Sequence, residues 1–229
     1  MSTLYIVATP IGNLKDITFR AVEVLKTVDC ILCEDTRTTK VLLNAYDIHV
    51  PTMSYHSQSA LSRSDEIIQI LKDGKNLALV SDAGTPCISD PGSALLSLVR
   101  KECAPDEVAI VPIPGASAFM TLLSAGGLDT SEFVFLGFLP HKKGRETLFK
   151  EIAGSSRTMI FYESPHRIIK TLTSLAGVLS DSPRKVLIGR ELTKIFEQII
   201  SGTASEMLAY FEKNPDKVRG EFVVAVEAV

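Results

Sequence analysis

The sequence predicts an α/β protein with two domains, an N-terminal α/β domain on a parallel sheet and a C-terminal α+β domain on a mixed sheet. Up to about residue 111, short apolar runs typical of buried strands alternate with amphipathic helical segments, which indicates a parallel sheet with right-handed crossovers. Residues 185–190 and 196–201 also resemble strands, but the link between them is too short for a crossover helix, so we expect an antiparallel pair. Prolines and a glycine within 112–118 indicate a hinge, and we expect domains at 1–114 and 115–229.

The expected N-terminal domain repeats a strand, a loop and a helical segment. Its strands are expected at 4–8, 30–33, 50–54, 77–80 and 108–111. One helix is expected to begin at Asp16, a second to run through Val41 and Leu42 to about Tyr46, a third to end at Gly74, and a fourth to contain 94–99. Because parallel strands end at the same edge of a sheet, we expect the loops that follow them to gather there.

In the expected C-terminal domain, strands and helices do not alternate regularly. A helix is expected at 116–125, and strands at 133–139, 158–162, 185–190, 196–201 and 221–226. Phe133, Phe135 and Phe138 alternate imperfectly, and we expect them in the core rather than on a stacking platform.

Composition excludes several classes of protein. The formal net charge of −3 over 229 residues excludes a globally basic nucleic-acid-binding surface, so contact with RNA requires a local patch. The chain enters a strand without a positively charged leader, and its apolar runs are shorter than a membrane span. We therefore expect a cytoplasmic protein with no membrane partner.

The four cysteines include a Cys-x-x-Cys pair, Cys30 and Cys33, which invites a zinc or redox interpretation. The pair lies in a strand-like run, where residues three apart face opposite sides of a sheet. We therefore expect reduced thiols and no metal site.

The loop after 77–80 contains Asp82, Gly84, Thr85 and Pro86, and it leaves the carboxyl end of a predicted strand, where ligands bind in open α/β sheets. It contains neither the dinucleotide-binding fingerprint nor a phosphate-binding lysine motif. Its carboxylate, hydroxyl and small residues suit a ribose diol or a cationic ligand. The alternative is a strand-to-helix turn, in which Asp90 caps the helix and Pro91 occupies its first turn.

Reactive side chains occupy four further strand-end loops, at 9–13, 34–37, 55–58 and 162–167. Glu34, Asp35 and His56 are candidate general bases, and Glu163 is a weaker one. The alternatives are a local ion pair of the acidic residues with Arg37 at a helix cap, and an ordinary loop histidine.

A local basic group contains Lys142, Lys143 and Arg145, together with Arg157, His166 and Arg167. It is either a solvated face or a groove for the phosphate backbone of RNA. In the second interpretation Lys142, Lys143, Arg145 and Arg167 are the RNA-binding residues.

Six motifs in order along the chain resemble those of the ribosomal RNA small subunit methyltransferase I family, of the tetrapyrrole-methylase-like superfamily. These motifs lie at residues 4–17, 34–37, 81–92, 112–118, 137–140 and 162–167. The resemblance implies a two-domain tetrapyrrole-methylase-like fold and a homodimer, with S-adenosylmethionine bound in the interdomain cleft. It implies 2′-O-methylation of a cytidine ribose in the decoding region of 16S rRNA, presented as free rRNA or as the 30S subunit.

Carried over position by position, the resemblance implies a donor pocket lined by Pro10, Asp82, Gly84, Thr85, Ile88, Gly115, Ser117, Tyr162 and Glu221. Members of the family commonly continue into a further basic segment, whereas this sequence ends at Val229. Two alternatives stay open: a tetrapyrrole C-methyltransferase of the same fold, and a non-catalytic ribosome-binding module.

Overall fold

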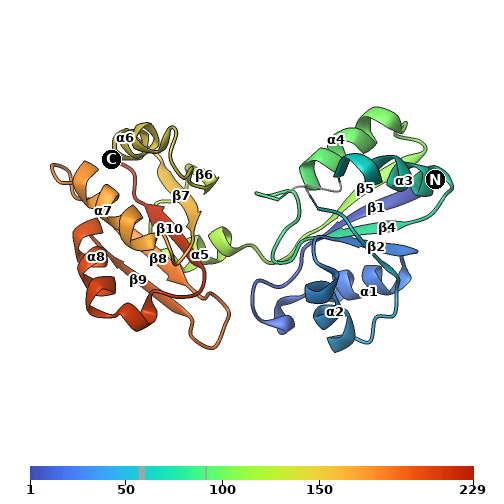
Figure 1. The fold of residues 1–229 in the computed structure, drawn as a ribbon, viewed down its shortest axis with the longest axis horizontal. Helices are drawn as coiled ribbons and strands as arrows, with labels where there is room; N and C mark the ends of the chain where they lie inside the picture. Colours follow the sequence, from blue (N-terminus) through green and yellow to red (C-terminus); the bar gives the residue numbers. More distant parts are fainter. Residues whose placement is uncertain (57–59, 91) are drawn as a thin grey trace. The chain divides into compact units, whose positions relative to one another are not determined.

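A computed structural model of the chain describes residues 1–56, 60–90 and 92–229, and it divides into two compact units, Met1–Ser117 (unit 1) and Ala118–Val229 (unit 2). Within these described residues, each unit is built on one five-stranded sheet (Figure 1).

The sheet of unit 1 is entirely parallel within its described strands, as predicted. Its strands are β1 (Ser2–Val7), β2 (Cys30–Cys33), β3 (Thr52–Ser54), β4 (Leu77–Val80) and β5 (Val108–Ile113), in the order β3-β2-β4-β1-β5. The short helix η1 (Leu14–Asp16) and helix α1 (Phe19–Thr27) follow β1, and α2 (Thr36–Ala45), α3 (Ala60–Lys72) and α4 (Gly92–Glu102) follow the next three strands.

Helices cover both faces of this sheet, α1 and α2 on one face and α3 and α4 on the other (Figure 1). Leu4, Leu77 and Leu79 pack on the α3/α4 side, whereas Val7, Ala78 and Val80 pack on the α1/α2 side. Alternation along each strand therefore divides the apolar residues between two cores.

The cysteine pair follows the same alternation. Cys30 packs against the core on the α3/α4 side and Cys33 lies in the core on the α1/α2 side. All four cysteines lie within the described residues and are free thiols. Burial raises the pKa of both Cys30 and Cys33, which keeps them protonated.

The predicted start of the first helix at Asp16 is wrong, because a separate turn precedes the helix. Asp16 ends η1, and α1 begins at Phe19 after Thr18, whose Oγ1 accepts a hydrogen bond from the Ala21 N–H at 3.1 Å. The side chain of Thr18 satisfies a donor that the first helical turn would otherwise leave unpaired.

The predicted cap at the start of α4 is confirmed. One carboxylate oxygen of Asp90 accepts from the Gly92 N–H at 2.7 Å, and the other accepts from the Cys87 N–H at 2.8 Å. Pro91, expected in the first turn, lies outside the described residues.

Unit 2 has the mixed sheet that the sequence predicts. After α5 (Ala118–Gly126) its strands are β6 (Phe133–Phe138), β7 (Thr158–Glu163), β8 (Val186–Arg190), β9 (Gln198–Gly202) and β10 (Phe222–Val226), in the order β6-β7-β10-β8-β9. The β6–β7 pair is parallel and the other three pairs are antiparallel, including the predicted β8–β9 pair.

Helices α6 (Arg145–Gly154), α7 (Ile168–Val178) and α8 (Ala204–Lys213) pack on one face of this sheet, and a short helix, η2 (Pro215–Lys217), follows α8. Phe161, Ile188 and Val224 face these helices. Helix α5 packs on the opposite pleat, where Leu122 lies against Gly189 of β8. Among the described residues, no helix is long and apolar enough to cross a bilayer.

A β-bulge changes the aromatic pattern of β6. The register against β7 shifts between Phe135 and Phe138, and Gly137 between them has a φ of +63°. The ring centroids of Phe135 and Phe138 consequently lie 5.0 and 5.3 Å from that of Tyr162. The expectation of core residues is wrong for Phe133, which is 36% exposed at the start of β6, and for Phe138, which the bulge redirects and leaves 61% exposed.

Candidate functional site

The strand order of unit 1 contains a topological switch point between β2 and β4. From β2 the chain continues outward to β3 through α2, whereas from β4 it continues in the opposite direction to β5 through α4. Ligands of doubly wound sheets bind beyond the carboxyl ends of the strands at such a point. The loops after β2 and β4, which carry several candidate residues, therefore lie at the expected ligand-binding edge.

The loop after β4 is tied to the loop after β1 by a short backbone bridge. The N–H of Thr9 donates to the carbonyl of Gly84 at 2.9 Å, and the N–H of Gly84 donates to the carbonyl of Thr9 at 3.1 Å. The Thr85 hydroxyl donates to the carbonyl of Ala116 at 3.1 Å. Gly84 has a φ of +84°, in the left-handed region that favours glycine. These contacts tie the start of the loop to two other segments of unit 1.

The later part of this loop contains two residues in an unfavourable backbone conformation. Cys87 and Ser89 have φ values of 70° and 62°. Asp90 stabilises this backbone by accepting from the Cys87 N–H. Strained conformations of this kind cluster at ligand-binding sites.

Carboxylates gather at the switch point. Asp82 is exposed, and its Oδ1 accepts a hydrogen bond from the Asp35 N–H at 3.2 Å. Burial, followed by the negative charges of Asp90 and Asp82, raises the pKa of Glu34. The structure thus brings Glu34, Asp35 and Asp82 together, as the loop positions predict, and adds Asp90.

The two adjacent acids after β2 have opposite electrostatic surroundings. Asp35 caps α2 by accepting from the Arg37 N–H at 2.8 Å, and it forms an ion pair with the Arg37 guanidinium at 2.7 Å. These contacts lower the pKa of Asp35 to about 2. The alternative of an ion pair at a helix cap is therefore confirmed for Asp35. Glu34, with its raised pKa, is the better candidate base.

His56 follows Tyr55, a buried core residue whose N–H donates to the carbonyl of Cys33 at 2.8 Å. His56 itself is half-buried after the end of β3. Ser57 and Gln58, the rest of the predicted loop, lie outside the described residues.

The residues carried over to the donor pocket lie in both units. Pro10 follows the Thr9–Gly84 bridge, and Ile88 is 45% exposed in the loop after β4. Gly115 is exposed, and a Cβ there would lie 2.9 Å from the Ala8 Cβ, so this close approach requires glycine. Ser117 is the last residue of unit 1.

Tyr162 and Glu221 belong to unit 2. Tyr162 pairs with Val223 across β7 and β10, and Glu221 immediately precedes β10, so both lie at one end of that sheet. Burial raises the pKa of Tyr162. Glu221 forms an ion pair with Lys194 at 2.8 Å.

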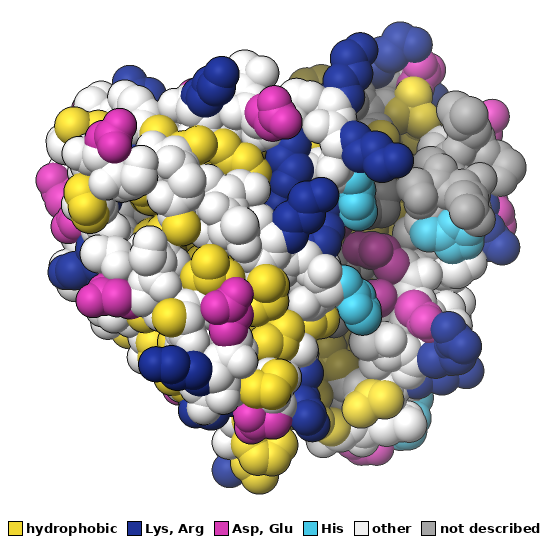
Figure 2. All heavy atoms as spheres, turned by 60° about the vertical axis from the view of Figure 1, so that its left-hand side comes forward, with side chains coloured by type: hydrophobic (Ala, Val, Ile, Leu, Met, Phe, Trp, Pro, Cys, Tyr) yellow, Lys and Arg dark blue, Asp and Glu magenta, His cyan; other side chains and the backbone are white. Residues whose placement is uncertain are grey.

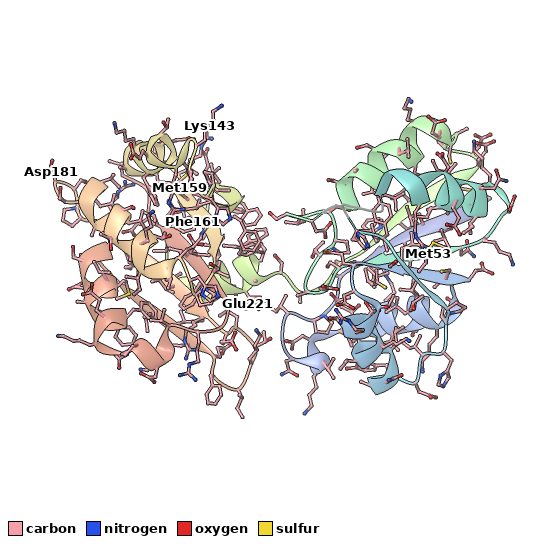
Figure 3. All side chains as sticks on the ribbon, viewed as in Figure 1. Met53, Lys143, Met159, Phe161, Asp181 and Glu221 are labelled. Atoms are coloured by element: carbon pink, nitrogen blue, oxygen red, sulfur yellow. The ribbon has the colours of Figure 1, made fainter. Side chains whose placement is uncertain are left out.

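The basic group separates into exposed and buried members. Lys142 and Lys143 are exposed, and Figure 3 shows Lys143 at the edge of unit 2. With unit 2 turned forward, Figure 2 shows Lys and Arg side chains grouped on part of its surface. Arg145 is only 7% exposed, and its guanidinium donates to the Thr171 hydroxyl at 2.6 Å. Its guanidinium is therefore turned away from solvent, where an RNA phosphate would bind.

Arg167 is also directed inward, because its Nε donates to Glu163 at 2.7 Å. Arg157 forms an exposed ion pair with Glu132 at 2.9 Å. The sequence interpretation missed the partnership of Arg145 with Glu163. The sequence does place Glu163 and Arg167 four residues apart, but this is not the spacing of a helical ion pair, because Glu163 ends β7 and Arg167 immediately precedes α7.

The described residues contain no group of three or more His, Cys, Asp or Glu side chains that could hold a metal ion.

Comparison with known proteins agrees with this arrangement. A sequence model of the family "Tetrapyrrole (Corrin/Porphyrin) Methylases" matches residues 3–208. Ribosomal RNA small subunit methyltransferase I of Bacillus subtilis is 46% identical over 228 residues, which cover 99% of this chain and 75% of that protein. The protein of the same name from Thermotoga maritima is 43% identical over 226 residues, which cover 99% of this chain and 98% of that protein.

Solved structures show the same fold. Cobalt precorrin-4 methyltransferase, described as a cobalamin biosynthetic enzyme, matches with a TM-score of 0.69 and 15% identity, covering 97% of this chain and 94% of that chain. Uroporphyrin III C-methyltransferase from Thermus thermophilus matches with a TM-score of 0.65 and 14% identity, covering 97% of this chain and 96% of that chain. At these identities the likeness establishes the fold and leaves the acceptor open.

Proposed function

We propose a function from the family of this chain, which belongs to the tetrapyrrole (corrin/porphyrin) methylases and, within them, to the ribosomal RNA small subunit methyltransferase I proteins. We propose that it methylates the 2′-hydroxyl of a cytidine ribose in the decoding region of 16S rRNA. The methyl donor is S-adenosylmethionine. The observation that carries the proposal is the 46% identity over 99% of the chain to a relative of that name.

The ligand-binding edge of unit 1 suits this donor. The donor carries a ribose diol, an ammonium group and a sulfonium centre, for which carboxylates are the natural partners. Asp82 is exposed at the switch point, with the charges of Asp90 and Glu34 close by. Gly84 and Gly115 allow the backbone to approach closely. We therefore propose that Pro10, Asp82, Gly84, Thr85, Ile88, Gly115 and Ser117 of unit 1 contact the donor, and, from the family resemblance alone, that Tyr162 and Glu221 also bind it.

When bound, the donor supplies an electrophilic methyl carbon whose leaving group is a neutral thioether. The residues of this chain have to align the acceptor and accept its proton. Glu34 suits the role of general base because its raised pKa increases its proton affinity. It also lies in the loop after β2, at the ligand-binding edge of unit 1. Asp35, with a pKa of about 2 and an Arg37 partner, suits a structural role. His56 remains the second candidate base.

Unit 2 offers a surface for the RNA backbone. Lys142 and Lys143 are exposed neighbours in the loop before α6, and we propose that they contact phosphates. Such contacts supply affinity and depend on salt, but they read no sequence. A homodimer and a cytoplasmic location complete the proposal; light scattering of the purified chain tests the first.

The experiment combines the purified chain with isotopically labelled S-adenosylmethionine and either free 16S rRNA or small ribosomal subunits. Digestion to nucleosides and mass analysis should give labelled 2′-O-methylcytidine. Label on a base, or no label on either RNA, would contradict the proposal. Transfer to a porphyrinoid carbon, tested in parallel, would favour the tetrapyrrole alternative. Failure to bind the donor in calorimetry would favour the non-catalytic module.

A further inference from the structure

A buried charged group lies at the end of β7. The side chain of Glu163 is fully buried and accepts hydrogen bonds from the Arg167 Nε at 2.7 Å and from the Thr171 hydroxyl at 2.6 Å. The Arg145 Nη2 lies 3.7 Å from the same carboxylate and donates to the Thr171 hydroxyl at 2.6 Å. The Arg145 guanidinium also lies 4.9 Å from the ring centroid of Phe149. We call Glu163, Arg145, Arg167 and Thr171 the Glu163 cluster.

The two arginines of the cluster also hold the loop that precedes α6. The Arg167 Nη2 donates to the carbonyl of Leu139 at 2.7 Å, and the Arg145 Nη1 donates to the carbonyl of Pro140 at 3.1 Å. The Arg145 N–H donates to the carbonyl of Lys142 at 3.2 Å. We call residues 139–144 the basic loop. Its backbone is thus fixed on both sides of His141.

The side chains between these anchors face solvent. His141, Lys142 and Lys143 are all exposed, whereas Leu139 is buried in the core of unit 2 and Arg145 is buried in the cluster. Gly144, which joins the loop to α6, has a φ of +81° and allows the chain to turn there. The loop therefore presents two adjacent lysines on a fixed backbone.

The charges of the cluster do not balance. Two guanidinium groups face one carboxylate, and the carbonyls of Leu139 and Pro140 also accept hydrogen bonds from these guanidinium groups. Removing one member of a buried charged group leaves its partners unpaired, which is costly. The loop carbonyls thus stabilise the buried arginines, and the arginines in turn fix the backbone of the loop.

We propose that Arg145 and Arg167 are positioning residues: with Glu163 as their shared anchor, they hold the basic loop so that Lys142 and Lys143 meet RNA phosphates, while neither arginine contacts RNA itself. The inference rests on the proposed RNA substrate. It adds that, within the basic group, the lysines contact RNA and the arginines position the loop. A fixed loop reduces the ordering that binding requires, so it increases affinity without a contact of its own.

A double-mutant cycle tests this division of labour. Binding of the chain to free 16S rRNA, or to small ribosomal subunits if these are the RNA that it binds, is measured for the wild type, for Arg145→Met, for Lys142→Gln/Lys143→Gln, and for all three substitutions together. Lys213→Gln is the matched control, because Lys213 is an exposed lysine at the end of α8, which α7 separates from α6. Thr171→Val repeats the cycle with a smaller change, since it removes only the hydroxyl between Arg145 and Glu163.

If Arg145 acts through the lysines, Arg145→Met reduces affinity about tenfold when they are present and less than about twofold when they are absent. Thr171→Val gives the same non-additive pattern, and Lys213→Gln leaves affinity unchanged. Equal losses in both backgrounds would show that Arg145 affects RNA binding independently of the two lysines and would overturn the inference. Calorimetry with S-adenosylmethionine checks the fold, and Thr171→Val decides the question if Arg145→Met fails to fold.

The two proposals fail differently. If the wild type binds neither free 16S rRNA nor small ribosomal subunits, the proposed function is overturned, and this inference with it. If the wild type binds and the losses are additive, only the inference is overturned.

Discussion

The N–H of Asp35 donates to the carboxylate of Asp82 at 3.2 Å, which joins the loops that follow β2 and β4 at the point where the connections of unit 1 diverge. This contact leaves Asp82 exposed toward solvent while fixing one of its oxygens. It also brings the negative charge of Asp82 near Glu34 and contributes to the raised pKa of that residue.

We predict that Asp82→Ala weakens binding of S-adenosylmethionine about 10- to 100-fold, because a charged acceptor is lost. Titration calorimetry measures the affinity directly. Asp106→Ala serves as a control, since Asp106 is exposed in the loop before β5, at the opposite edge of the sheet. Equal affinity of the wild type and Asp82→Ala would remove Asp82 from the pocket.

Glu34→Gln should lower kcat at saturating donor by about 10²–10⁴-fold. Because the pKa of Glu34 is raised, wild-type activity should increase as the pH rises through that value and the carboxylate loses its proton. Asp35→Asn should keep this increase of activity with pH, since the pKa of Asp35 is about 2. If the activity of Glu34→Gln still increases with pH as in the wild type, another residue is the base, and His56→Gln is the next variant to test.

The same raised pKa predicts an effect on stability. Glu34 holds its proton more tightly in the folded state, so its carboxylate destabilises the fold as the pH rises above the unfolded value of about 4.3. Glu34→Gln should therefore raise the unfolding temperature at neutral pH and change it little near pH ~4. A larger gain in acid than at neutral pH would contradict the direction of the shift.

Gly84→Ala should destabilise unit 1 by about 1–2 kcal/mol, because a Cβ is unfavourable in the left-handed region at φ +84°. The added Cβ would have ordinary contacts, 3.4 Å from the Ile11 Cγ2 and 3.6 Å from the Ala116 carbonyl oxygen, so the cost is conformational. Denaturant unfolding measures it. Gly154→Ala is the control, since a Cβ added at Gly154, the last residue of α6, would have no neighbour within 4 Å. Equal stability of Gly84→Ala and the wild type would mean that the loop relaxes.

Lys142→Glu/Lys143→Glu should weaken binding to 16S rRNA and leave donor affinity unchanged. The slope of log K against log salt should fall by about 0.7 for each lost phosphate contact on single-stranded RNA. Binding at several salt concentrations gives this slope. An unchanged slope would mean that the two lysines lie on a solvated face.

Local pattern was sufficient to predict much of the fold. The apolar run at 77–80 is β4, and the divergence of Cys30 and Cys33 onto opposite faces follows from the period of a strand. Parallel pairing then places the loops after β2 and β4 at one edge. Each of these features depends on neighbours in sequence, which is why periodicity was enough.

Other features depend on tertiary contacts and were not predictable in this way. Glu34 and Asp35 are adjacent acids, and tertiary structure distinguishes them: Glu34 is partly buried near Asp90 and Asp82, whereas Asp35 pairs with Arg37 at a helix cap. Arg145 follows two exposed lysines in the sequence but is buried against Thr171, which is far away along the chain. Phe138 is exposed because of a bulge that its alternation with Phe135 does not reveal.

The central claim is most directly tested by mapping 2′-O-methyl groups on 16S rRNA from cells with and without this protein. The account predicts that one decoding-region cytidine loses its ribose methyl group in the absence of the protein. The purified wild-type chain with S-adenosylmethionine should restore it, and Asp82→Ala should restore it poorly. An unchanged methylation pattern in cells without the protein would contradict the account.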